Sequence, residues 1–300
     1  MALRTTTTER QRRLGVELKK LREDAKLTAH EGGALIGMGR VHFTHVEGGN
    51  TAISAERIRT LCTSYGVTSS TYVDALVDLA EPSGKGWRNG YKGQIPPSAI
   101  DLAELESKAT DLRSYESLFL PGLFQLEEYT RSIFQASDAV TTSEGIESAV
   151  RFRMQRQDVL TAGGAPTVHA VVHEAALHMR FGGAKVMRRQ LLRLVELAEL
   201  PHMTIQVFPF TADAVSALTT PFCHIGSHGG ALETVLVEHP AESMFLHGSE
   251  SVAKYRRQFD RLSAAALPPI DTAVLTVKQA SRDSLGLIQH ILYTLQEARS

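Results

Sequence analysis

Three histidines and a glutamate gather in one short stretch, and these are residue types that bind zinc. His173 and Glu174 begin a sequence similar to the HExxH motif, in which two histidines four residues apart share a metal ion on one helix face. The second histidine, His178, here comes five residues after the first, so the two would point about 140° apart on a helix. His169 lies four residues before His173, but the valine-rich segment between them reads as a strand. We therefore expect no metal site.

The sequence also lacks the patterns that place a nucleophile or a phosphate group. No serine lies in a GxSxG pattern, and no GxxxxGK[S/T] loop occurs. The glycine-rich segment 226–230 lies between two strand candidates, which favours a hairpin turn over a phosphate-binding loop. The sequence therefore predicts that the chain is not an enzyme and has no cofactor.

A different kind of contact is indicated by residues 40–46. In a helix over this segment, Phe43 and Val46 would face inward. The outward side would then carry four residues: Arg40, Val41, Thr44 and His45. Arginine can pair with guanine, threonine can donate or accept a hydrogen bond, and valine can contact a thymine methyl group. These side chains predict contact with the major groove of double-stranded DNA; a plain five-helix bundle with a solvated third helix is the alternative.

Basic residues near the N-terminus extend this candidate surface. Arg12 and Arg13, together with Arg10, lie at the start of the first predicted helix, where they would meet phosphates or form a solvated face. Thr28 and His30, at the start of the second predicted helix, complete the candidate DNA-binding residues. Residues 1–70 hold 11 Lys and Arg against 7 Asp and Glu, and the remainder holds 21 against 26. A basic head on an acidic body is compatible with a nucleic-acid partner.

The elements that would position these residues are five short helices within the first 80 residues. Thr8 with Gln11, and Thr28 with Glu31, have the spacing of capping boxes at helix starts. Ser54 is placed to cap a fourth helix, and the apolar spacing over 72–79 predicts a fifth. The tight turn at 37–39 directs the third helix across the second, which is typical of a helix-turn-helix domain.

The rest of the chain mixes helices and short strands. Residues 81–100 read as a linker, because 82–86 and 95–98 are rich in turn formers. Strands are predicted at 167–172, 204–208, 222–225 and 234–237, and helices at 102–109, 128–134, 146–160, 186–200, 251–266 and 285–295. We therefore expect a mainly α N-terminal five-helix helix-turn-helix domain (1–80), a linker (81–100) and a C-terminal α+β domain with a small sheet (101–300) for regulation or dimerisation.

Composition and cysteine usage suit this organisation. The 300 residues are 43% hydrophobic and 22% charged, as in ordinary soluble proteins. No apolar stretch approaches the ~20 residues that cross a bilayer. Cys62 and Cys223 lie far apart and offer no disulfide framework. The expectation is a cytoplasmic protein without a membrane partner.

Residues 9–80 resemble the helix-turn-helix domain of the XRE, or lambda-repressor-like, family. The stretch 27–49 carries the resemblance, and its ending Phe-Thr-His-Val-Glu-Gly-Gly, residues 43–49, carries most of the specificity. The resemblance implies that the third helix is the recognition helix. Gly32 and Gly33 depart from the pattern, since an apolar residue and alanine are usual there and each glycine costs about 1 kcal/mol in a helix. Gly39 stands where a serine cap is usual.

The C-terminal part resembles a second pattern. Residues 115–129, Tyr-Glu-Ser-Leu-Phe-Leu-Pro-Gly-Leu-Phe-Gln-Leu-Glu-Glu-Tyr, are similar to a signature of actinobacterial regulators that join an XRE head to an antitoxin-like domain of unknown function. Segments 181–183, 205–210 and 237–238 also match. Phe124, Leu126 and Thr130 depart from the signature.

The two resemblances imply a sequence-specific DNA-binding transcription regulator. Such a head would act on a pseudo-palindromic operator as a homodimer, and the amphipathic helices expected at 146–160 and 285–295 are candidates for the pairing surface. The alternative is an antitoxin-like interaction module, which binds a small partner protein and regulates itself through DNA binding.

Overall fold

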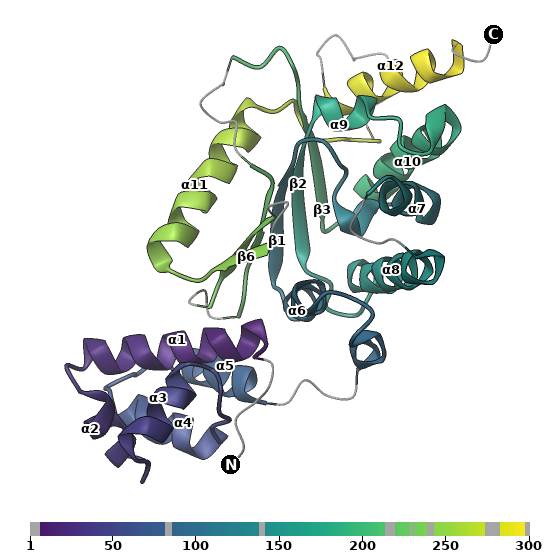
Figure 1. Ribbon diagram of the computed structural model, residues 1–300. Coiled ribbons are helices and arrows are strands. Elements are labelled where there is room, and N and C mark those ends of the chain that lie inside the picture. Colours follow the sequence, from purple (N-terminus) through teal and green to yellow (C-terminus); the bar gives the residue numbers. More distant parts are fainter. Residues whose placement is uncertain are drawn as a thin grey trace.

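A helical N-terminal part and a larger mixed part make up the computed structural model (Figure 1). The structure describes residues 7–81, 86–137, 142–213, 220–228, 230, 232–238, 243–273 and 283–297. Of the predicted loop at 82–86, only Gly86 lies among the described residues. The expected fold class, a helix-turn-helix region followed by an α+β region, is confirmed.

The N-terminal part consists of the five predicted helices. They are α1 (Glu9–Asp24), α2 (Ala29–Ala34), α3 (Arg40–Glu47), α4 (Ala55–Ser64) and α5 (Ser70–Ala80). Both predicted capping boxes form, at Thr8 with Gln11 and at Thr28 with Glu31. The turn between α2 and α3 uses Gly37 in the left-handed region, at φ +68°, where glycine avoids the strain of a Cβ atom. Buried Leu18, Phe43 and other apolar side chains form one core for the five helices.

The two glycines that break the expected pattern of α2 have a packing reason. A Cβ atom on Gly32 would lie 2.9 Å from the ring of Phe43, and one on Gly33 would lie 2.6 Å from the carbonyl oxygen of Met38. Neither distance leaves room for a methyl group. The glycines therefore let α2 and α3 approach closely, and their cost in helix propensity is offset by this packing.

The second part is built on a six-stranded sheet of order β3-β2-β1-β4-β5-β6. The strands are β1 (Asp111–Glu116), β2 (Thr167–His173), β3 (Met203–Phe208), β4 (Phe222–Ile225), β5 (Thr234–Glu238) and β6 (Ser243–Leu246). β1, β2 and β3 are parallel to each other, and β4, β5 and β6 continue the sheet in antiparallel pairs. The four predicted strands are confirmed, and β1 and β6 were not predicted.

Helices cover both faces of this sheet (Figure 1). Helix α11 (Ser249–Ala265) packs on one face, over Tyr115, Phe222 and their neighbours. The other face carries the larger core and is covered by the remaining helices. These are α6 (Pro97–Glu106), α7 (Glu127–Ala136), α8 (Ser143–Arg156), α9 (Glu174–His178), α10 (Gly183–Ala198) and α12 (Ser284–Glu297), with short 3₁₀ turns at Trp87–Tyr91, Gly122–Phe124 and Gln157–Leu160.

The two helices that were expected to supply a pairing surface have their apolar sides covered within the chain. In α8, Val150 is 1% exposed and Phe152 is 4% exposed, and Phe152 packs against Trp87, with ring centroids 5.3 Å apart. In α12, Ile288 and Ile291 are buried in the larger core, where α12 packs against α10. Neither apolar face is available to a second copy, so this ground for dimerisation is wrong. Among the described residues, no helix is long and apolar enough to span a bilayer.

Candidate DNA-binding surface

Helix α3 presents the predicted base-reading residues on its outer side. Arg40 is its first residue, and Val41 is 73% exposed. Thr44 is exposed, and its hydroxyl donates to the carbonyl oxygen of Arg40 at 3.0 Å. His45 is half-buried, whereas Phe43 is fully buried. The structure thus brings Arg40, Val41 and Thr44 together on a surface that no other described element covers.

The opposite side of α3 is fixed to α1. The ideal Cβ position of Gly15 lies 2.3 Å from the carbonyl oxygen of Glu47, so the backbones of α1 and α3 are in direct contact there. Arg22 on α1 donates from Nε and Nη2 to the two carboxylate oxygens of Glu47, at 2.7 and 3.1 Å. Both side chains are buried, and the hydrogen bond to Glu47 raises the pKa of Arg22. This bidentate ion pair holds the end of α3 at a defined angle to α1.

Thr28 and His30 lie exposed at the start of α2. The hydroxyl of Thr28 already has partners, because it accepts from the Glu31 N–H at 3.3 Å and donates to Glu31 Oε2 at 2.7 Å. The side-chain hydrogen bond from Thr28 lowers the pKa of Glu31. Thr28 therefore serves as a helix cap, and His30 is exposed on the surface beside it.

The N-terminal arginines do not form the phosphate-contacting group that the sequence suggested. Arg13 is 3% exposed, pairs with Glu17 at 2.9 Å and donates to the carbonyl oxygen of His247. Arg10 is 4% exposed and pairs with Glu104 at 2.5 Å. The prediction that Arg13 contacts DNA is contradicted by its burial, and Arg10 is excluded for the same reason. Arg12 is exposed, with Glu9 as its partner.

Arg10 and Arg13 instead join the helical N-terminal part, the head, to the second part built on the sheet, the body. The Glu9 N–H donates to Asp101 Oδ2 at 3.2 Å, on α6. Burial, together with the neighbouring charge of Glu104, raises the pKa of Asp101 to about 7. On the other side, His247 Nε2 lies 3.4 Å from Glu9 Oε2, and burial lowers the pKa of His247 to about 4. The junction is therefore a buried polar contact made by α1, α6 and the turn after β6.

These long-range pairs could not be found from the sequence. Arg10 and Glu104 are 94 positions apart, and no periodic pattern relates residues at that separation. The junction directs α1 and α5 toward the body and leaves α2, α3 and α4 on the far side (Figure 1). The candidate base-reading surface thus faces away from the body.

Comparison with known proteins gives two matches along the chain. Residues 13–76 match a helix-turn-helix domain. Residues 99–276 match a domain of unknown function, DUF5753. No curated protein and no solved structure matches the chain.

Proposed function

The chain belongs to the family defined by the DUF5753 domain, here preceded by a helix-turn-helix domain, and on this premise we propose that it is a sequence-specific DNA-binding transcription regulator. The observation that carries the proposal is the outer side of α3. Arg40, Val41 and Thr44 are exposed there together, on a helix whose inner side is locked to α1 by Arg22 and Glu47. A rigid helix with exposed side chains of these types fits the major groove.

We further propose that the chain acts on DNA as a homodimer. One helix-turn-helix head buries a modest surface on DNA, and such heads gain affinity when two recognition helices lie one duplex turn, about 34 Å, apart. This proposal rests on the geometry of recognition alone. Sedimentation of the full chain on its selected duplex should give two chains per duplex.

Selection of bound duplexes from a random DNA pool tests the function directly. The full chain should enrich one motif, made of two half-sites whose centres are about 10 base pairs apart. Enrichment of a single half-site would retain the DNA-binding function and refute the dimer. A pool that shows no enriched sequence after repeated selection would refute the proposed function itself.

A further inference from the structure

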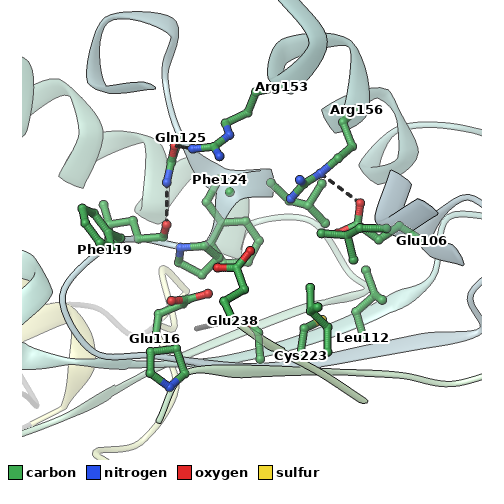
Figure 2. A pocket seen from close by; sticks show the side chains of 18 of the residues that line it. Glu106, Leu112, Glu116, Phe119, Phe124, Gln125, Arg153, Arg156, Cys223 and Glu238 are labelled. Carbon is green, nitrogen blue, oxygen red and sulfur yellow. Dashed lines mark hydrogen bonds and ion pairs between the residues drawn. The ribbon is translucent and has the colours of Figure 1, made fainter. Parts of the chain in front are cut away.

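A cavity of about 230 Å³ lies between the sheet and the helices that carry the body's larger core. Its floor is one face of β1, β4 and β5. The sheet register places Ser114, Cys223 and Leu236 side by side across these strands. Glu116 and Glu238 come two residues after Ser114 and Leu236, so they lie on the same face at the same end of the sheet. In Figure 2 both carboxylates point into the cavity.

The roof of the cavity is the loop over 120–125, part of the stretch that resembles the regulator signature. Gln125 Nε2 donates to the carbonyl oxygen of Leu120 at 2.7 Å, and Gln157 Nε2 donates to that of Gly122 at 3.1 Å. Gln190 Nε2 donates to the carbonyl oxygen of Phe124 at 2.9 Å. Three glutamine side chains therefore hold this loop in place, and the cavity has a rigid, preformed shape.

The positive charges in the cavity wall are paired within the chain. Arg156 Nε lies 2.9 Å from Glu106 Oε2, and both side chains are largely buried. Arg153 donates to Gln125 Oε1 at 2.8 Å and lies 4.7 Å above the ring of Phe134. The two guanidinium groups thus have partners on α6 and the roof loop (Figure 2) and on α7.

The negative charges are not balanced in the same way. Within the described part of the chain, Glu116 and Glu238 make no ion pair or hydrogen bond. Glu106 is 3% exposed, and its Oε2 has no hydrogen bond of normal geometry among the described residues. When all three carboxylates are ionised, they face only two guanidinium groups, and one bound positive charge would neutralise the lining. Glu116 is half-buried without a donor among the described residues, which is costly, and a bound donor would relieve that cost.

We propose that this cavity binds a small organic cation, a primary amine or guanidinium on an apolar body, whose charge pairs with Glu116 and Glu238. The apolar body would contact Leu112, Leu120 and Phe124, which line the same cavity. Pockets for drug-sized ligands have volumes of about 300–1,000 Å³. The cavity here is smaller, so it suits a small metabolite. The carboxylate oxygens of Glu116 and Glu238 would then fix the orientation of the ligand's head group.

The titratable groups in the lining support a link between binding and proton release. They are Glu106, Glu116, Glu238, Arg153, Arg156 and Cys223. Burial, followed by the charge of Glu238, raises the pKa of Glu116 to about 8, and burial raises that of Glu106 to about 7. Both carboxyls are therefore partly protonated near neutral pH. A bound cation favours the ionised form, so binding should release a proton and strengthen as the pH rises toward 8.

Helix α6 connects this cavity to the DNA-binding head. Its Leu102 and Glu106 line the cavity, whereas Asp101 and Glu104 contact Glu9 and Arg10 on α1. A ligand that disturbs the ion pair between Glu106 and Arg156 would therefore also disturb the contacts that α6 makes with α1 at the junction. This last consequence rests on the proposed function, whereas binding itself does not.

Thermal unfolding of the full chain with three matched probes tests the proposal without DNA. Phenethylamine, 2-phenylethanol and 3-phenylpropanoate share an aromatic body and differ in charge. Phenethylamine at millimolar concentration should raise the melting temperature, and the other two should not. Putrescine and agmatine serve as further cationic probes. Stabilisation by the carboxylate alone, or by none of the cations, would overturn the proposal.

Variants locate the binding in the cavity. E116Q and E238Q should each weaken the binding of the cation by about tenfold or more. E250Q, on the exposed start of α11, should leave it unchanged. Titration calorimetry in phosphate and Tris buffers should show proton release for the native chain and less for E116Q. Cation binding that E116Q and E238Q do not weaken would refute the site, even if DNA binding is confirmed.

Discussion

Arg40 and Arg10 are both arginines near the start of a helix in the same small domain, yet they serve opposite faces of it. Arg40 is exposed on α3, whereas Arg10, on α1, is 4% exposed and paired with Glu104 of the body. The face of the helical domain that carries the exposed side of α3, the outer face, therefore keeps its polar side chains available. The face toward the body, the inner face, uses its charged side chains in the junction. The difference shows that basic residues in a DNA-binding domain cannot be assigned to DNA by type alone, because burial decides which of them can reach a phosphate.

The largest expected effect comes from breaking the inner face. Arg10→Ala would remove the buried ion pair with Glu104, and breaking such a pair typically costs about 3–5 kcal/mol. Urea unfolding followed by circular dichroism should show this loss in the free energy of unfolding. Arg12→Ala removes an exposed pair and should cost less than about 1 kcal/mol. If the two variants were equally stable, Arg10 would not be a junction residue.

The packing of α2 on α3 supports the outer face, and Gly33→Ala tests it. The added Cβ would meet the Met38 carbonyl oxygen at 2.6 Å, so we expect a net loss of about 1–2 kcal/mol despite the better helix propensity of alanine. Gly39→Ser is the matched control, since nothing lies within 4 Å of a Cβ there and serine can cap α3. Its melting temperature should stay equal or rise. A Gly33→Ala chain as stable as the native one would refute the close approach.

The pH dependence of the inner face should change in Asp101→Asn. The pKa of Asp101 in the folded chain is about 7, well above its unfolded value of about 4. The folded state therefore binds the extra proton between these values, and the native chain loses stability from this group as the pH rises from about 4 to about 7. Asparagine does not titrate, so the variant should gain about 2–3 kcal/mol relative to the native chain at pH ~8 compared with pH ~5.

Urea unfolding of both proteins at the two pH values gives this difference directly. The contribution of His247 is present in both proteins and cancels in the comparison. Parallel pH profiles for the two proteins would show that Asp101 is not protonated at the junction.

The smallest expected effect concerns phosphate contacts. Since Arg10 and Arg13 are buried, only Arg12 of the three can release a counterion. Arg12→Ala should lower the slope of log K against log salt concentration by at most about 1, rather than by the ~3 expected for three contacts. Fluorescence anisotropy over a salt series measures the slope. An unchanged slope would indicate that Arg12 remains solvated in the complex.

Local signals in the sequence predict the helical head well and the pocket poorly. Thr8 and Thr28 mark helix starts through capping chemistry that acts over three residues, and the structure confirms both caps. Strand β1 was missed because each of its faces mixes apolar and polar side chains: Leu112, Ser114 and Glu116 share the cavity face. Strands β2 and β3 lie in the same sheet but have apolar runs that identify them.

The polar residues that hid strand β1 from the sequence analysis are themselves informative. Polar residues in the middle of a sheet weaken the strand signal, and they are also what a ligand cavity needs. The junction pairs and the cavity charges bring together residues far apart in the chain, so only the folded structure reveals them.

The central claim is that α3, and not the inner face, recognises DNA. The most direct test is the affinity of the Arg40→Ala, Thr44→Ala double variant for a duplex selected by the native chain, measured by fluorescence anisotropy. The matched control is Arg261→Ala, on the exposed side of α11 in the body. We predict that the double variant melts at the native temperature and binds about 10- to 100-fold more weakly, while the control binds as the native chain does. Native affinity in the double variant would contradict the account.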